Sequence, residues 1–162
     1  MVPPIASNAM RKLTLLLLGV MAFVACSKEP PADKIKGSYG CEVHLYTRYM
    51  KNGKWRDTSY VSTSNNAVVI ERIDDDHVSI KATSKKWGKA IAPVAGISDF
   101  NYQANFSGDG RDTLYLENGQ KYPADISGTV SYESHDMAVS VRVPNFPNSG
   151  NKYILAFTNR KN

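Results

Sequence analysis

The sequence predicts an all-β domain, an antiparallel up-and-down β-barrel of about eight strands over residues 36–162. From residue 36 onward, apolar side chains recur at every second position, which is the period of strands and not of helices. Turn sequences such as Asn52-Gly53 and Asn118-Gly119 separate the runs, and two-residue hairpin turns favour them because both central residues need positive φ. Short strands joined in order by short turns are typical of an antiparallel meander.

The alternating runs define the expected strands and their buried faces. Apolar and polar residues alternate over 39–45, 78–82, 100–106, 124–132, 137–143 and 153–157. A count of about eight strands treats 59–73 as one bent strand, whereas a break at 64–66 adds one more. Closing the meander into a barrel removes its exposed edges. The side chains expected to line the interior are Tyr39, Cys41, Val43, Leu45, Phe100, Tyr102, Phe106, Val139, Val141, Leu155 and Phe157.

The interior of such a barrel can hold packed side chains or one small ligand. Several of the expected inward residues are aromatic, which favours a filled core over a cavity. After residue 26 the only cysteine is Cys41, so the domain has no internal disulfide to support it. Its stability therefore has to come from the core.

The N-terminal residues have the pattern of a secretory leader. Met10-Arg11-Lys12 is a basic start, residues 13–24 are apolar, and Ala25-Cys26 offers a small residue at the cut. We expect residues 1–25 to be a signal peptide whose true start is Met10. Val24-Ala25-Cys26 resembles the lipobox of bacterial lipoproteins, which implies lipidation of Cys26. The alternative is an ordinary secretory leader.

Residues 26–35 are expected to form the lipidated cysteine and a flexible, proline-stiffened tether. The charged stretch after Cys26 resembles the surface-export signal of Bacteroidetes lipoproteins. This implies a lipid-anchored protein of the outer membrane that faces the medium, with a periplasm-facing orientation as the alternative. The formal charge of +5 falls when the leader removes Arg11 and Lys12. The remainder is too small for a dedicated nucleic-acid surface, so no nucleic-acid partner is expected.

No set of residues predicts an enzyme. Cys41 and His44 lie three apart on a strand and face opposite sides, beyond the reach of a thiolate–imidazole pair. Ser134-His135-Asp136 contains the residue types of a catalytic triad. These three residues are neighbours in one turn, whereas a triad is assembled from distant segments of the chain. Residues 74–77 lack the glycine and terminal glutamate of a calcium loop. We expect no catalytic residues, no metal and no cofactor.

Segments spread over most of the domain carry a family resemblance. The opening residues 35–40, with Gly37-Ser38-Tyr39, resemble the first strand of the calycin-like, lipocalin-like lipoproteins of Bacteroidetes. Residues 78–80, 102–108, 126–130 and 153–158 look like later strands of that group. The resemblance implies the calycin fold and says little about a ligand. Asn159 stands where a glycine is common.

The connection 84–96 is expected to be the longest loop, with at most a turn or two of helix. It contains Lys85, Lys86, Trp87, Lys89 and Ile91. A tryptophan flanked by cations is a favourable composition for binding a protein partner. The alternative is that the tryptophan covers one end of the barrel. Trp55 is a second exposed-aromatic candidate, with Tyr49 and Tyr60 near it.

These features favour a non-enzymatic protein-binding module on the cell surface. Its sharpest form is an inhibitor of a secreted peptidase, because small barrel lipoproteins that protect an outer membrane in this way are similar in plan. The binding residues would be Lys85, Lys86, Trp87, Lys89, Ile91 and Trp55. The alternative is a lipocalin-type carrier of a small apolar ligand inside the barrel. A structural or immunity-type lipoprotein without a soluble ligand is a third hypothesis.

Overall fold

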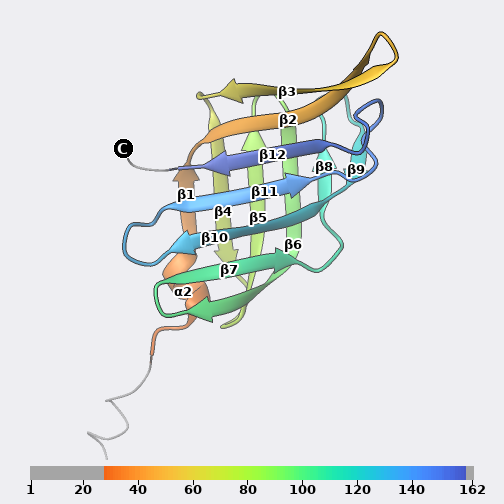
Figure 1. The fold of residues 1–162 in the computed structure, drawn as a ribbon. Helices are drawn as coiled ribbons and strands as arrows, with labels where there is room; N and C mark the ends of the chain where they lie inside the picture. The colour runs from red at the N-terminus through yellow and green to blue at the C-terminus, as the bar shows by residue number, and fades with distance from the viewer. Residues whose placement is uncertain (1–27, 160–162) are drawn as a thin grey trace, which may run out of the picture.

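The structure, a computed structural model, describes residues 28–159 and has an all-β antiparallel architecture (Figure 1). The expected signal peptide and Cys26, the expected site of lipidation, lie outside the described residues. The elements are α2 (Pro31–Ile35), β1 (Gly37–Gly40), β2 (Glu42–Lys51), β3 (Lys54–Ser62), β4 (Asn66–Arg72), β5 (His77–Ser84), β6 (Gly88–Phe100), β7 (Gln103–Gly108), β8 (Thr113–Tyr115), β9 (Lys121–Pro123), β10 (Asp125–Ser131), β11 (Met137–Arg142) and β12 (Tyr153–Thr158).

The strands form one curled sheet in the order β1-β4-β5-β6-β7-β10-β11-β12-β2-β3, and the short hairpin β8–β9 is added beside β6. Figure 1 shows two walls: β4, β5 and β6 run steeply behind β7, β10, β11, β12, β2 and β3, which cross them. Strand β6 connects the walls, because its first part pairs with β5 and its last residues pair with β7. The two walls enclose the core between them.

The predicted count of eight strands and the closed barrel are both wrong. The sheet is a curled half-barrel of ten strands, each paired with the next, and its end strands β1 and β3 do not pair with each other. The extra strands arise at two bends. Cys41 separates β1 from β2, and 63–65 separate β3 from β4, where Asn65 has a φ of 57°. The long strand expected over 59–73 is therefore broken near 64–66.

The interior between the walls is filled with side chains. Phe157 is fully buried and pairs with Val43 on β2 and Val139 on β11, which are also buried. The other expected interior residues that are buried are Tyr39, Leu45, Phe106, Val141 and Leu155. Strand alternation therefore identified the buried face correctly along these strands.

Three expected interior residues lie elsewhere. Phe100 and Tyr102 are 47% and 63% exposed. They have the parity of the buried Phe106, but they lie at the turn between β6 and β7, beyond the end of the core. Cys41 is half-buried at the bend between β1 and β2, and burial raises the pKa of its thiol to about 11. These positions are a rim and a corner of the sheet, not its interior.

A short helix lies where the sequence predicted only tether. Pro31 begins α2, a position where proline loses no helical hydrogen bond. Ala32 and Ile35 are fully buried in the core, and the Tyr39 hydroxyl donates a 2.6 Å hydrogen bond to the Ile35 carbonyl. The last residues of the expected tether therefore belong to the folded domain.

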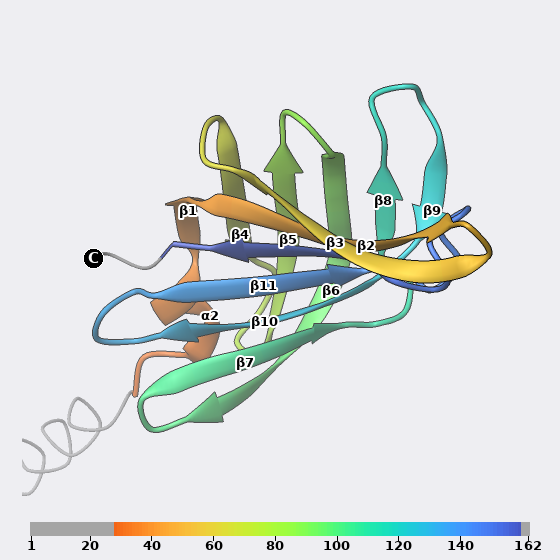
Figure 2. The ribbon, with the colours of Figure 1, turned by 45° about the horizontal axis from the view of Figure 1, so that its top comes forward.

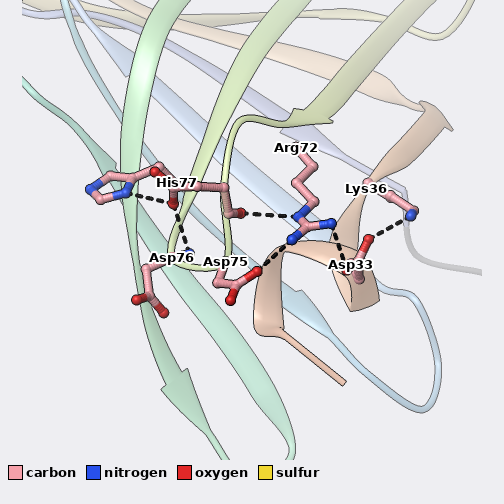
Figure 3. A network of polar contacts seen from close by, with 7 residues as sticks. Asp33, Lys36, Arg72, Asp75, Asp76 and His77 are labelled. Carbon is pink, nitrogen blue, oxygen red and sulfur yellow. Dashed lines mark hydrogen bonds and ion pairs between the residues drawn. The ribbon is translucent and has the colours of Figure 1, made fainter. Parts of the chain in front are cut away.

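Figure 3 shows the polar contacts that fix α2 to the turn between β4 and β5. Asp33 Oδ2 lies 3.2 Å from Arg72 Nη1, and Asp33 Oδ1 lies 2.5 Å from Lys36 Nζ. Arg72 also pairs with Asp75, whose carbonyl accepts the Ala32 N–H at 3.4 Å. The hydrogen bond from Lys36, with the charge of Arg72, lowers the pKa of Asp33. The N-terminal segment therefore leaves the domain at a fixed place.

A buried carboxylate connects β8 to β10. Asp112 is 3% exposed, and its Oδ2 accepts the Ile126 N–H at 2.7 Å. Its Oδ1 has no partner among the described residues. Burial raises the pKa of Asp112, despite the opposing hydrogen bond from Ile126.

Replacing Asp112 with alanine should lower the free energy of unfolding by about 1–3 kcal/mol, because the buried Ile126 N–H loses its acceptor. D112N keeps an acceptor and should lose less. Since the folded pKa lies above the unfolded value of 3.8, the contribution of Asp112 is full below pH 3.8 and declines as the pH rises through the folded pKa. Urea unfolding over a pH series measures both effects, and a D112A variant as stable as the native protein would contradict them.

Candidate protein-binding surface

The hairpin of β2 and β3 extends beyond the core. Its turn, Asn52-Gly53, has φ values of 51° and 73°, as a type I′ turn requires. Val43 and Leu45 at its base are buried, but most side chains from residue 46 to 61 are exposed. We name residues 46–61 the hairpin arm. In Figures 1 and 2 its turn lies at the opposite end of the molecule from α2.

The hairpin arm exposes large apolar side chains on both of its faces. Single exposed apolar residues are ordinary on a protein surface, whereas a contiguous group indicates an interaction site. The exposed apolar residues of the arm are Tyr46, Tyr49, Met50, Trp55, Tyr60 and Val61, each between 40% and 52% exposed. Tyrosine, tryptophan and methionine, which make up most of this group, are enriched in protein interfaces.

The inner face of the arm continues the face that is buried at its base. Cross-strand pairing places Tyr49 opposite Arg56 and Lys51 opposite Lys54 on this face, and Tyr60 opposite Leu45. A hollow of about 470 Å³ is lined by Tyr49, Lys51, Asn52, Lys54 and Arg56. Within the described part of the chain, none of these three cations forms an ion pair. The inner face therefore combines aromatic rings with uncompensated positive charge.

Ion pairs hold the outer face of the arm. Asp57 accepts from Arg48 Nε at 2.7 Å and from Lys152 Nζ at 2.7 Å. Trp55 lies beside Gly150, where an added Cβ would come within 3.0 Å of its ring. Since Lys152 and Gly150 belong to the loop before β12, the arm is supported from one side by the rest of the domain.

The hydrogen bond from Arg48, followed by that from Lys152, lowers the pKa of Asp57 from 3.8 to about 2. Because the folded pKa is depressed, the contribution of Asp57 is present above pH 3.8 and is lost as the pH falls through about 2. We expect R48M to return the pKa of Asp57 toward 3.8. An NMR titration of the carboxyl carbon measures it, with R142M as the control. An Asp57 that titrates near 3.8 in the native protein would contradict the ion pairs.

The structure corrects the expected loop 84–96. Only Lys85, Lys86 and Trp87 form a turn, and Lys89 and Ile91 lie within β6, where they pair with β5 and β8. No turn of helix occurs there. Lys89 Nζ lies 5.7 Å from the ring centroid of Tyr115 on β8, away from the arm's own strands. The predicted group of binding residues is therefore divided between a tight turn and a strand.

The turn between β5 and β6 meets the inner face of the arm. Lys86 Nζ lies 5.9 Å from the ring centroid of Tyr60 and 5.1 Å from that of Trp87. Trp87 is half-buried and packs against the core, beside a hollow of about 300 Å³ that Leu116 and Tyr153 also line. Trp87 thus covers one end of the core, while Lys86 adds a fourth cation to the arm's inner surface.

The sequence indicated Trp55 as an exposed aromatic residue with Tyr49 and Tyr60 near it, but the cations between them were missed. Lys51, Lys54 and Arg56 share the inner face because the Asn52-Gly53 turn fixes the register. The two-residue turn is visible in the sequence and sets the cross-strand pairs of the hairpin. Pairing the residues outward from Asn52-Gly53 would therefore have placed these side chains on one face.

Among the described residues, those considered for chemistry make local contacts. His44 bonds to Glu42 at 3.0 Å and stacks on Tyr46, with ring centroids 6.1 Å apart. Within Ser134-His135-Asp136, the Asp136 N–H donates to Ser134 Oγ at 3.3 Å, a contact inside the turn. Over residues 28–159, no three histidine, cysteine or acidic side chains gather closely enough to hold a metal ion. Nor is any helix in that range long and apolar enough to cross a membrane.

Comparisons with known proteins support the fold. No protein-family model matches the sequence, and no curated protein is significantly similar to it. Among solved structures, the chain is similar to a Bacteroides fragilis protein assigned to the outer membrane, with a TM-score of 0.57 and 17% identity. The match covers 83% of this chain and 54% of that one, so this chain spans about half the length of its structural neighbour. At this identity the likeness concerns the β-barrel-like fold.

Proposed function

We propose that the protein is a lipid-anchored, surface-exposed lipoprotein of the outer membrane that acts as a non-enzymatic protein-binding module. The supporting observation is that the hairpin arm carries both exposed aromatic side chains and cations without ion-pair partners among the described residues. The binding surface comprises the arm and the adjoining Lys86. A partner with exposed acidic groups would complement the cations and bury the rings.

The position of α2 supports an arm that points away from the membrane. The chain from Cys26 to Pro31 can span at most about 18 Å when fully extended. Asp33 and Arg72 fix the start of the domain at the end opposite the arm (Figure 1). The likeness to an outer-membrane protein of Bacteroides fragilis is consistent with this location.

The sharpest form of the proposal is an inhibitor of a secreted peptidase, with the arm in or beside the enzyme's cleft. We expect the lipidated protein in detergent to inhibit at least one peptidase secreted by its own host at nanomolar concentration. The double variant W55S/Y60S should lose this inhibition. The matched control is F100S/Y102S, which removes two exposed aromatic side chains from the turn at the other end of the sheet.

No inhibition of any co-secreted peptidase would contradict the inhibitor form. Equal loss in both double variants would contradict the assignment of binding to the arm.

A lipocalin-type carrier is disfavoured by the packing of the interior. Phe157, Leu155 and Ile126 are among the side chains at most 1% exposed that fill the space between the walls. The hollow of about 570 Å³ lined by Cys41 and Thr63 lies at the corner between β1 and β2, outside that space. Native mass spectrometry of protein from its own host should find the polypeptide and its lipid alone, and a retained small apolar molecule would restore the carrier hypothesis.

A further inference from the structure

Strand β3 is an end strand of the sheet. It pairs with β2 alone, from Lys54 to Ser62. Over the described residues, no backbone hydrogen bond joins 54–62 to any other element. Most of its residues are exposed, and only at its last residue does a side chain bond to its backbone, where Asn66 Nδ2 donates to the Ser62 carbonyl at 2.8 Å among the described residues. Unpaired strand edges of this kind can template the addition of another strand.

The hairpin turn fixes which backbone groups are free. In a two-residue hairpin, the residues that flank the turn exchange both hydrogen bonds, and bonded and non-bonded pairs then alternate. Lys51 and Lys54 flank the turn, so alternate positions of β3 from Lys54 onward bond to β2. The residues between them direct their N–H and C=O groups outward, and these are Trp55, Asp57, Ser59 and Val61.

The side chains beside this edge define what would fit there. On the inner face, Lys54 and Arg56 have no acidic partner within the structure's described range, Lys51 lies opposite Lys54, and Lys86 lies beside Tyr60 further along the strand. On the outer face, Trp55 and Val61 are 45% and 50% exposed. A strand laid along β3 would alternate between these two faces. Such a strand would fit both faces if its acidic side chains lay on the inner face and its apolar side chains on the outer face.

We propose that β3 binds its partner by strand addition, taking up an extended segment in which acidic and apolar residues alternate. The inference rests on the proposed protein-binding function and names the kind of segment that is bound. Main-chain hydrogen bonds along the edge supply affinity, and alternate side chains supply specificity. A second copy of this chain is a poorer occupant, because two paired β3 strands would bring the cations of both copies onto one face.

Ser59 allows the backbone contribution to be tested alone. Its N–H points away from β2, so S59P removes an outward donor without breaking a bond of the hairpin, as is tolerated on an edge strand. S59A is the matched control, since it removes the hydroxyl and keeps the N–H. The probe is a synthetic peptide of about eight residues in which glutamate and valine alternate, compared with one of lysine and valine.

We expect the full-length protein to bind the glutamate–valine peptide and not the lysine–valine peptide, by calorimetry. S59P should weaken binding about tenfold, which corresponds to the loss of one or two backbone hydrogen bonds, and S59A should bind as the native protein does. K54E/R56E should reverse the preference between the peptides.

Hydrogen exchange provides a test without any variant. The amides of Trp55, Asp57, Ser59 and Val61 should exchange rapidly in the free protein and become protected by the glutamate–valine peptide. The amides of Arg56, Thr58 and Tyr60, which already bond to β2, should change little. Protection of both sets equally would overturn strand addition.

Other outcomes separate the inference from the proposed function. If S59P binds as tightly as the native protein while K54E/R56E does not, the arm binds through side chains and strand addition is wrong. If the native protein binds neither peptide but W55S/Y60S still abolishes peptidase inhibition, the inference fails and the proposed function stands. A dimer that S59P dissociates would identify a second copy as the occupant and overturn the acidic segment.

Discussion

Replacing Gly128 with valine is expected to lower the free energy of unfolding by about 3 kcal/mol or more. Gly128 lies on β10 between Phe106 of β7 and Val139 of β11. A Cβ at this position would lie 2.6 and 2.7 Å from two carbons of the Phe106 ring. Phe106 is 3% exposed, and the same Cβ would lie 2.4 Å from the backbone carbonyl oxygen of Ala138. The glycine is therefore a space requirement of the core.

The matched control for G128V is G96A. Gly96 also lies within a strand, but an added Cβ there would meet nothing within 4 Å. We expect G96A to change stability by less than about 0.5 kcal/mol. Urea unfolding followed by tryptophan fluorescence measures both variants. Equal stability of G128V and the native protein would mean that Phe106 does not pack over β10 as described.

Replacing Phe157 with alanine is expected to cost about 3–5 kcal/mol. Phe157 is fully buried between β2 and β11, so its removal leaves a cavity that two paired strands cannot close. The control is F100A, which removes the same side chain from a position that is 47% exposed. We expect F100A to change stability by less than about 0.5 kcal/mol.

Together, F157A and F100A test whether Phe157 lies inside the core and Phe100 outside it. If F100A costs as much as F157A in denaturant unfolding, Phe100 is an interior residue, as its spacing in the sequence predicted. If F157A costs little, the interior is loosely packed, and a ligand cavity becomes a better explanation of the fold.

Alternation in the sequence predicted the face of each strand but not where the core ends. Val139, Val141, Leu155 and Phe157 are buried as their spacing indicated. Tyr102 shares the parity of Phe106, yet it lies in a turn outside the two walls. Parity depends on local backbone geometry, whereas burial depends on how far the opposite wall extends. That extent is a tertiary property that no single run contains.

The error over 84–96 has a different cause. Ala90, Ala92 and Gly96 are small, and Pro93 lacks a backbone donor, so the segment has low strand propensity and resembles a loop. In the structure Ala90 and Ala92 are fully buried in β6, where the strand lies between β5 and β8 and pairs with both. Tertiary packing favours small side chains at that place and overrides their propensity.

The candidate binding surface was partly predictable. Asn52-Gly53 indicated a hairpin, and Trp55 was identified as exposed beside it. The sequence could not show that the hairpin extends beyond the core, or that β3 is left unpaired on one side. Both facts follow from the bends at Cys41 and at 63–65, which divide the expected long strands. The edge strand and its free backbone groups arise from those bends.

The most direct test of the account is site-specific photocrosslinking of the full-length protein in its own host. A photoreactive phenylalanine derivative is placed at Trp55 on the arm or at Phe100 at the opposite end, two positions of similar exposure. We expect a covalent adduct with another protein from position 55 and none from position 100. Adducts from position 100 alone would show that the partner binds the end opposite the arm, and the assignment of the hairpin arm would be wrong.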